Sequence, residues 1–529
     1  MAMSPAAKPG GGGARSKTAE ELSEELGWSW YQWRLFLFVG LCVAADSIEV
    51  NLLSFISVEA TKDWHLEEFW EDTVAAAVFG GEVLGCALFG LFADNYGRLP
   101  AFAMGVAFVS AFGIASSFAA NVEQLVVMRF GVGLGIGGFT VPFDLLAETA
   151  PTRIRGLALC AVWLFWTLGS VLLNLMAASC LRDEDGPGGR DPLGWRWLTF
   201  LAAVPPLVSL LGIPFVDESP SWLAARGRQD EARAIITRAA RMNGVALDPD
   251  FAVEPEPARD VSVAQLFDAS NAFRTACLWT LNFASHFAYY GVVLFLPRLL
   301  GASASDPYNF NALLLSCVGE VIGSVAACVF VRTVARNALL AAGATALACA
   351  VPVVLAADAP TWALLAAALV ARGAANVAAS LTWIVTPEGY NVEVRATGHA
   401  WGNLRARAGA LCTTYWGGAA VGEPVKVGSY VAVAATMAVV AAAMPEGVMK
   451  GSRPEKAGLF TDEARENEPG RRARRDVWCV RLKQLPAREA ASAHRGRAAR
   501  SRVRVGVPLG HPERTQTWDI AHCQQQRIQ

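Results

Sequence analysis

Charged residues are scarce in this chain, and so are the motifs that mark catalytic or metal sites. Only 17% of the 529 residues are charged and 53% are hydrophobic, which is too apolar for an ordinary soluble protein. The 11 cysteines show neither metal-like spacing nor a paired framework, so we interpret them as small packing residues. The sequence contains no nucleophile elbow, Walker loop or metal cluster. We therefore expect neither an enzyme nor an ATP-driven pump, and no cofactor or metal.

One glycine-rich segment fits the dinucleotide-binding fingerprint but lies in the wrong context. Gly133, Gly135 and Gly138 have the spacing G-x-G-x-x-G, yet they lie inside an apolar run with no soluble strand before it. Glycines four residues apart, such as Gly133 and Gly137, let another helix approach closely. We predict that this segment packs against the first or second apolar span.

Long apolar segments dominate the sequence, and each is long enough to cross a bilayer core of about 20 helical residues. We count twelve, at about 34–56, 74–92, 100–120, 124–146, 157–178, 197–216, 275–296, 312–331, 338–356, 362–385, 398–418 and 427–444. The first, seventh and eleventh carry polar residues, and the last is short. Because unpaired backbone groups cannot face lipid, we expect a closed helical bundle with the lipid bilayer as its partner.

Two charged patterns repeat at about half the length of the chain. The turn that ends in Arg98 has a counterpart ending in Arg336, 238 residues later. Glu148 and Arg155 are seven residues apart, and Glu388 and Arg395 repeat that spacing 240 residues later. A membrane chain whose loop charges repeat at half length is typical of a transporter built from two similar halves.

Basic residues concentrate in alternate loops. They are Lys8, Arg15, Lys17, Arg98, Arg153, Arg155, Arg226, Arg228, Arg332, Arg336, Arg395 and those of the Arg-rich tail. The opposite loops are acidic or neutral, as at 63–72 and 183–185. By the positive-inside bias, both termini are cytoplasmic.

These patterns divide the chain into five parts. We assign 1–29 to a disordered cytoplasmic leader, 30–216 to a first six-helix bundle, 217–272 to a cytoplasmic central loop, 273–446 to a second bundle, and 447–529 to a disordered Arg-rich cytoplasmic tail. Within the central loop, the residues from Gln229 to Asn243 have the spacing of a short amphipathic helix.

Several motifs resemble those of the major facilitator superfamily. The loop from Asp94 to Arg98 looks like the loop between its second and third spans. The sugar-porter pattern is similar to Arg129 with its following glycines, Glu148…Arg155-Gly156, Gly194-Trp-Arg196 and Glu218-Ser-Pro-Ser-Trp222. Finer features resemble the branch related to synaptic vesicle glycoproteins and organic-ion carriers: Tyr31-Gln-Trp33, Asp46…Glu49, Tyr289-Tyr-Gly291, Thr386-Pro-Glu388 and Arg407-Ala-Gly409.

The resemblance runs from about Gly27 to Glu446, and the second-half loop at Val331–Arg336 departs from it by lacking the acidic residue and the glycine. It implies an all-α multi-pass membrane protein with twelve transmembrane helices in two pseudo-symmetric six-helix bundles. It also implies a functional monomer that binds a small-molecule solute, with no nucleic-acid partner.

The resemblance places a cytoplasmic gate in the repeated loops. Its residues are Asp94, Gly97, Arg98, Glu148, Arg155, Arg336, Glu388 and Arg395. Gly97 permits a tight turn, Asp94 can cap a neighbouring helix, and Arg98 can reach Glu148. Partly exposed ion pairs contribute about 0–1 kcal/mol each, so several together can bias which side is open. Alternatively, these charges only anchor helix ends at the membrane interface.

Charges inside the spans are costly, about 2.5–3.5 kcal/mol each on insertion scales, and so suggest function. Asp46 and Glu49 share one face of the first span, and Arg129 on the fourth lies at a similar depth. Counterparts in the second half are Glu320 and Arg372. The candidates for carrying a proton are Asp46, Glu49, Asp144 and Glu320, with Arg129 as a partner. Alternatively, these residues form static buried pairs that fix helix register.

A further set of residues lies in spans that line the central cavity in this superfamily. It comprises Trp163, Trp166, Asn282, His286, Tyr289, Tyr290, Arg372, Asn376 and Arg407. Aromatic rings can stack on a sugar or attract an organic cation, and buried polar groups require partners from the bundle or from a ligand. Taken singly, each aromatic ring is more often a packing or interface-belt residue.

Two functions follow from the sequence. The first is secondary transport of a small organic solute, a sugar or an organic ion, by alternating access with a proton as co-substrate. The second is a non-transporting receptor or vesicle-associated binding protein on the same scaffold. Symport, uniport and antiport remain alternatives at this point, as do the plasma membrane and an organelle membrane.

Overall fold

The computed structural model describes residues 15–181, 194–248, 251–254, 263–269, 271–300, 308–331, 333–354, 356, 359–390, 394–418 and 422–444. All of them fall in one compact unit, Met1–Glu455. The predicted Arg-rich tail at 447–529 lies outside the described residues.

The first half is built from helices that follow the predicted spans. They are α2 (Trp30–Asp63), α3 (Glu68–Tyr96), α4 (Arg98–Ser116), α5 (Val122–Ile136), the 3-10 turn η1 (Gly137–Phe139), α6 (Thr140–Thr149), α7 (Thr152–Leu181), α8 (Gly194–Ala202), α9 (Val204–Gly212) and the 3-10 turn η2 (Ile213–Phe215). The second half contains α12 (Ala272–Leu299), α13 (Phe310–Phe330), α14 (Arg336–Val354), α15 (Thr361–Gly389), α16 (Arg395–Gly418) and α17 (Glu423–Ala443).

Among the described residues, ten helical segments have the length and hydropathy needed to span a bilayer. Two of them combine shorter elements, namely α5 to α6 and α8 to η2. The remaining long helices, α12 and α16, correspond to the seventh and eleventh predicted spans, whose polar residues include His286 and Arg407. Both pack inside the bundle, α12 against α15, α16 and α17, and α16 against α3. The chain is therefore an all-α multi-pass membrane protein with twelve spans in two six-helix bundles.

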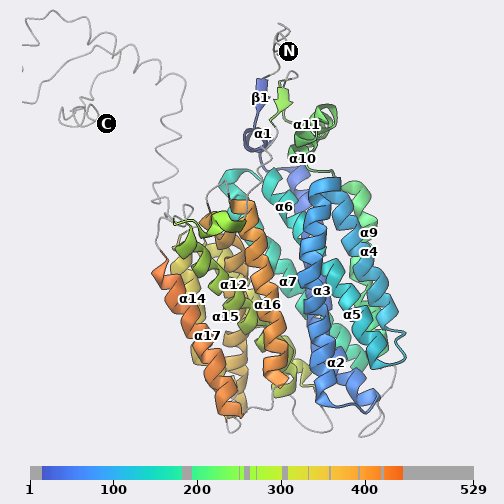
Figure 1. Ribbon diagram of the computed structural model, residues 1–529, viewed down its shortest axis with the longest axis vertical. Helices are drawn as coiled ribbons and strands as arrows, with labels where there is room; N and C mark the ends of the chain where they lie inside the picture. Colours follow the sequence, from blue (N-terminus) through green and yellow to red (C-terminus); the bar gives the residue numbers. More distant parts are fainter. Residues whose placement is uncertain are drawn as a thin grey trace, which may run out of the picture. The chain divides into compact units, whose positions relative to one another are not determined.

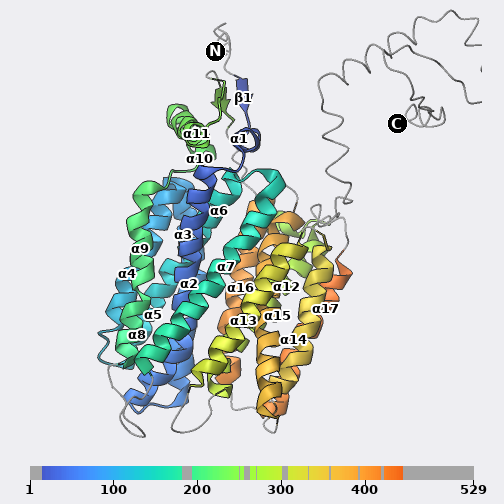
Figure 2. The same ribbon diagram turned by 180° about the vertical axis from the view of Figure 1, so that it is seen from behind.

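The two halves meet along two pairs of helices. The first-half helices lie on one side of Figure 1 and the second-half helices on the other. There α16 runs beside α3, and the view from behind in Figure 2 shows α7 beside α13. α12 of the second half also contacts α2 of the first, and α15 contacts α7.

The internal repeat is visible in how helices pack. A Cβ atom added at Gly81 or Gly85 of α3 would lie 2.2 Å from a backbone oxygen of α5. Gly319 and Gly323 of α13, each 238 residues later, make the corresponding approach to α15, at 2.1 and 2.6 Å. The same glycine-mediated contact thus occurs once in each half, as expected for a repeated bundle.

The glycine-rich segment of α5 packs as predicted. A Cβ at Gly133 would lie 2.0 Å from the Val78 carbonyl oxygen, and one at Gly137 would lie 2.4 Å from the Cys86 nitrogen, both on α3. The prediction of close packing against the first or second span is confirmed, and the partner is the second span.

A short cap formed by the leader and the central segment covers one end of the first half. Its elements are β1 (Arg15–Lys17), α1 (Ala19–Leu26), α10 (Pro220–Ala225), α11 (Gln229–Asn243) and β2 (Phe251–Val253); the 3-10 turn η3 (Val263–Phe267) follows it in the chain. β1 pairs in parallel with β2, with Arg15 opposite Phe251. Leu22, Ile235 and Phe251 share one buried apolar cluster.

This cap corrects one prediction and confirms another. Residues 15–26 form β1 and α1, so the expectation of a disordered leader is wrong for that part. α1 begins with a capping box between Thr18 and Glu21, a signal that is readable in the sequence. The amphipathic helix predicted from Gln229 to Asn243 is present with those bounds.

Candidate functional site

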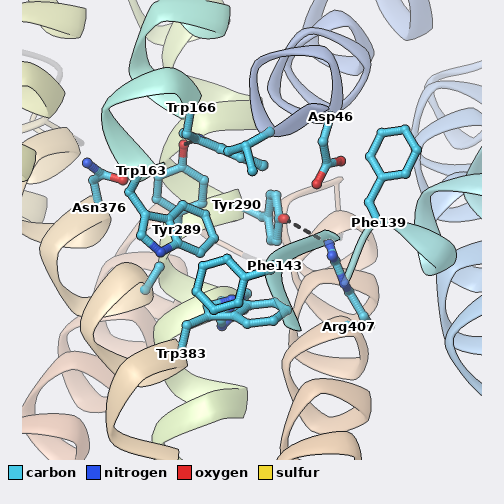
Figure 3. A pocket seen from close by; sticks show the side chains of 13 residues that line it. Asp46, Phe139, Phe143, Trp163, Trp166, Tyr289, Tyr290, Asn376, Trp383 and Arg407 are labelled. Carbon is cyan, nitrogen blue, oxygen red and sulfur yellow. Dashed lines mark hydrogen bonds between the residues drawn. The ribbon is translucent and has the colours of Figure 1, made fainter. Parts of the chain in front are cut away.

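The main cavity lies between the two halves. It is lined by Val43 and Asp46 (α2), Phe139 (η1), Phe143 (α6), Trp163 and Trp166 (α7), His286, Tyr289 and Tyr290 (α12), Asn376, Ala379 and Trp383 (α15) and Arg407 (α16). Figure 3 shows these side chains converging from both halves. The space in which the centre of a water molecule fits is ≈ 40 Å³, enough for a few waters at about 10–15 Å³ each. An organic solute therefore requires the walls to move apart.

A break in the fourth span supplies part of the wall. The α-helical pattern gives way to the 3-10 turn η1 at Gly137–Phe139 before α6 begins. Such interruptions occur at functional positions inside helices. The break places Phe139 and Phe143 at the cavity, and neither residue was among the sequence candidates.

Aromatic rings form a continuous wall. Trp163 lies 5.7 Å from Trp166 and 5.9 Å from Trp383, measured between ring centroids. Trp166 lies 6.1 Å from Tyr289, which lies 5.3 Å from Tyr290. These spacings fall in the range of favourable edge-to-face contacts. The spacing of Trp163 and Trp166 by three residues on α7 puts both rings on one helix face.

Asp46 does not pair with Arg129, contrary to the predicted cluster. It lies instead at the cavity beside Arg407 of the second half (Figure 3). Arg407 Nη1 forms an ion pair with Glu82 Oε2 at 2.7 Å, and both side chains are nearly fully buried. The same Nη1 donates a hydrogen bond to the Tyr290 hydroxyl at 3.2 Å. Two carboxylates, Asp46 and Glu82, thus share one guanidinium that crosses from the opposite half.

The other part of the predicted cluster is present. Arg129 donates from Nη1 to Glu49 Oε2 at 3.0 Å and from Nε to Ser116 Oγ at 3.0 Å. Both members of this ion pair are fully buried. Neither residue lines the cavity. The predicted pairing of Glu49 with Arg129 is confirmed, whereas its role in carrying a proton remains a prediction.

A second buried ion pair lies in the other half. Arg372 Nε donates to Glu320 Oε1 at 2.9 Å, and the Tyr289 hydroxyl donates to the same oxygen at 3.0 Å. Arg372 also donates to Asn51 of α2 at 3.2 Å, so this pair is connected to the first half. Arg372 does not line the cavity. It is connected to the lining residue Tyr289 because both donate to the same oxygen of Glu320.

Two other sequence candidates also lie outside the lining. Asn282 donates to the Thr386 hydroxyl and to the Leu278 carbonyl, each at 2.8 Å. Asp144 on α6 is half-buried and interacts electrostatically with His399 and Arg98.

The Asp94–Arg98 turn of the first half is held by a residue that the sequence analysis placed in the sugar-porter pattern but not in the gate. Glu218, just before α10, accepts hydrogen bonds from the backbone nitrogens of Arg98 and Leu99 at 3.0 and 3.1 Å. It therefore caps α4, a position where a carboxylate is favourable. Gly97 has φ +116°, and a Cβ there would lie 2.5 Å from Glu218 Oε2. The turn requires glycine for both reasons.

The predicted capping role of Asp94 is replaced by an ion pair with Arg98 at 3.0 Å. Glu148 accepts a hydrogen bond from Ser219 and interacts electrostatically with Arg98. Arg155 donates to the Ala150 carbonyl at 3.2 Å and lies 3.6 Å from Glu20 of the cap. These loop charges are joined to the leader and the central segment.

The degenerate loop of the second half still forms its ion pair. Arg336, which is buried, pairs with Glu388, which is partly exposed. These residues correspond by the repeat to Arg98 and Glu148. The side chain of Arg395 lies outside the described residues.

Comparison with known proteins decides the family. Residues 43–404 match the family model described as "Sugar (and other) transporter". The chain belongs to this family. Its fold is that of the major facilitator superfamily, since it aligns with the proton:xylose symporter XylE bound to 6-bromo-6-deoxy-D-glucose with a TM-score of 0.61 and 19% identity. That alignment covers 77% of this chain and 94% of the other.

Curated relatives of this transporter family are similar to parts of the chain. A synaptic vesicle 2-related protein from Xenopus laevis is 29% identical over 283 residues, which are 54% of this chain and 50% of the relative. The chain thus spans about half the length of that relative. The niacin transporter NiaP of Acinetobacter baylyi is 29% identical over 391 residues, covering 72% of this chain and 85% of NiaP.

Glu82 is the main functional candidate that sequence reasoning missed in this transporter-family chain. It is a single glutamate inside the apolar second span, and it lies 238 residues before Glu320, the same separation as between Arg98 and Arg336. The repeat therefore contained a signal for Glu82, whereas no sequence signal links it to Arg407.

Proposed function

We propose that this protein is a secondary transporter that moves a small organic solute across a membrane by alternating access, with a proton as the coupling ion. Membership of the sugar (and other) transporter family and the described fold support transport in general. NiaP is a niacin transporter and XylE a proton:xylose symporter, and both support an organic solute that is a sugar or an organic ion.

The observation that carries proton coupling is the arrangement of Asp46, Glu82 and Arg407. Asp46 lines the cavity between the halves, and its Arg407 neighbour is anchored on α16 of the opposite half. When Asp46 is ionised, it attracts Arg407 and favours the halves close together on this side. When Asp46 is protonated, that attraction is lost, and the equilibrium between two arrangements shifts.

The loop-end pairs supply a second bias. Asp94–Arg98, Arg155–Glu20 and Arg336–Glu388 are partly exposed, so each contributes about 0–1 kcal/mol. Each pair joins residues of one half, so it favours one arrangement by holding the loops of that half in place. We assign them to a gate at the end that the charge pattern places in the cytoplasm, with both termini on that side.

Uptake into proteoliposomes under an imposed pH gradient tests this function. Wild-type protein should accumulate or release a solute against its gradient only when the pH gradient is present. Asp46→Asn should abolish the proton-driven component of solute movement. Unchanged proton-driven accumulation would remove Asp46 from coupling, and binding without movement under any gradient would show a receptor instead.

A further inference from the structure

Most hydrogen-bond donors around the cavity are already engaged with one another. Trp166 Nε1 donates to the Tyr289 hydroxyl, which in turn donates to Glu320. Trp383 Nε1 donates to His286 Nε2 at 3.2 Å. A ligand that needs these donors, as a sugar or a carboxylate would, must first displace an internal hydrogen bond.

The remaining polar side chains of the second half are similarly occupied. His286 Nδ1 lies 3.0 Å from the Asn282 carbonyl oxygen. Because His286 Nε2 accepts from Trp383, its single ring proton is on Nδ1 and the ring is neutral. Asn376 Nδ2 donates to Ser324 Oγ at 2.8 Å and to the Glu320 carbonyl at 3.3 Å.

Three buried polar atoms of the lining make no hydrogen bond with any described residue: Asp46 Oδ1, Trp163 Nε1 and Arg407 Nε. Of these three atoms, Asp46 Oδ1 is the acceptor, and Asp46 is 8% exposed. In Figure 3 it points toward Tyr290 and Arg407. Arg407 is already neutralised by Glu82 at 2.7 Å. Two carboxylates and one guanidinium therefore leave one uncompensated negative charge at the cavity when all three are ionised.

The rings next to this charge suit a cation. The rings of Trp163, Trp166, Tyr289, Tyr290 and Trp383 line the same small space. Aromatic faces attract ammonium groups, most strongly when water is excluded. Trp163 Nε1 makes no hydrogen bond with a described residue and is left for a polar substituent of the ligand.

We propose that the cavity binds a small organic monocation, with its cationic group at Asp46 and its apolar part against the aromatic wall. This inference rests on the proposed transport function and names the solute class of that same site.

A proton and an organic cation cannot both neutralise the same carboxylate. The titratable and charged groups that face Asp46 are Glu49 on its own helix, Glu82 and Cys86 on α3, His286 and Tyr290 on α12, and Arg407 on α16. Glu49 is paired with Arg129, and Glu82 with Arg407. The single excess charge accepts either one proton or one cation, so the coupled movement is an exchange of cation for proton.

Calorimetric titration of the purified full-length protein tests the ligand class with three molecules of nearly equal shape. They are choline, the neutral 3,3-dimethylbutan-1-ol and the anionic 3,3-dimethylbutanoate; D-xylose represents a sugar. At pH 7.5, choline should bind at least about tenfold more tightly than the neutral analogue. The preference should shrink at pH 5, where protons compete for Asp46, while binding of the neutral analogue should not change.

Substitutions at the cavity test which side chains cause the preference for choline over the neutral analogue. Asp46→Asn should lower choline affinity by at least about 30-fold and leave the neutral analogue unaffected, whereas Asp46→Glu should retain the preference for choline. Trp163→Leu keeps an apolar surface but removes the ring, so choline affinity should fall by about 3- to 30-fold. Because the wild-type preference needs no variant, a misfolded Asp46→Asn protein would not prevent the test.

Several outcomes would overturn the inference. They are equal or tighter binding of the alcohol, the carboxylate or xylose, and an unaltered choline preference in folded Asp46→Asn protein. Uptake of 3,3-dimethylbutanoate or xylose, but not of choline, under a pH gradient would also contradict the proposed cation site, while it would support the proposed transport function. Preferential choline binding with no movement under any gradient would reject transport and preserve the cation site.

Discussion

The two halves of the protein meet along two helix pairs that the internal repeat makes equivalent, yet among the described residues an ion pair crosses only one of them. At the α3–α16 interface, Arg407 forms an ion pair with Glu82. At the α7–α13 interface, the residue 240 positions before Arg407 is Thr167, whose hydroxyl lies 3.3 Å from Ser324 Oγ. Separation of the first pair breaks a buried ion pair, whereas the hydrogen bonds described across the second pair join neutral groups.

The two interfaces also differ in whether the arginine that pairs with the buried glutamate comes from the opposite half or from the same half. Glu82 and Glu320 are repeat-equivalent, but Glu82 is paired across the interface with Arg407, and Glu320 is paired within its own half with Arg372. A change in the charge of the first pair therefore alters the attraction between the halves directly. A change in the second acts through Tyr289 and Asn51. Coupling between protonation and rocking is accordingly expected at α3–α16.

Arg407→Ala should have the largest effect on this comparison. It leaves Glu82 and Asp46 buried without their cation, a situation that costs about 3–5 kcal/mol. We expect loss of thermal stability and at least about 100-fold slower transport. Thr167→Val, at the equivalent position of the neutral interface, removes one hydroxyl contact and should cost only about 1 kcal/mol.

A double variant separates charge pairing from packing at the same interface. Glu82→Gln with Arg407→Gln removes both charges and should recover much of the stability lost by Arg407→Ala, because no unpaired guanidinium or Glu82 carboxylate remains. Equal stability of the Arg407→Ala and Thr167→Val proteins in thermal unfolding would contradict the assigned difference between the interfaces.

The neutral interface offers a native cross-link as the next prediction. Cys160 of α7 and Cys328 of α13 are in side-chain contact. Mild oxidation should join them and stop transport in the cross-linked fraction, because the halves could no longer separate on that side. Reductant should restore activity, and Cys160→Ser protein should be unaffected by oxidant. Full activity of a quantitatively cross-linked sample would show that this interface does not open.

Gly97→Ala should have a moderate effect confined to the first-half turn. The φ angle of +116° and the close Glu218 carboxylate make a side chain there cost about 1–3 kcal/mol. Ala335 lies 238 residues later in the equivalent turn, so Ala335→Gly is a matched control with a change within about 0.5 kcal/mol. Thermal unfolding and transport assays would reveal whether the two turns are as different as described.

Glu388→Gln should have the smallest effect. Its ion pair with Arg336 is partly exposed, so its loss should cost about 0–1 kcal/mol. We expect a modest shift toward the arrangement open at the loop end, which alkylation of a cysteine introduced near that end would detect. A loss of activity as large as that of Arg407→Ala would assign the main switch to the loop end.

The fold was predictable because it depends on local patterns. Span length, the loop charges and the repeat of about 240 residues specified twelve spans in two halves, and the period of α11 gave its bounds. The ion pairs of Glu49 with Arg129 and of Glu320 with Arg372 could be predicted from depth along helices, since rise per residue is nearly constant.

The charged part of the site was less accessible to sequence reasoning. The contact of Arg407 with Glu82 joins residues in different halves, and its geometry depends on how far the halves have rocked. Phe139 and Phe143 reach the cavity through the 3-10 break at η1, which hydropathy does not reveal. Glu218 caps α4 but lies in the central segment, more than 100 residues later in the sequence. Local turn propensity carries no information about a contact between residues so far apart.

Because β1 pairs in parallel with β2, the part of the central segment up to Glu254 belongs structurally to the first half and is not an unattached linker between the halves. β2, α10 and α11 share their apolar core with the leader helix α1, and Glu218 is hydrogen-bonded to the start of α4. A chain divided after Glu254 and produced as two co-expressed fragments should thus reassemble into a working carrier. A cut placed ahead of α10 would remove this cap from the fragment that needs it and should prevent reconstitution.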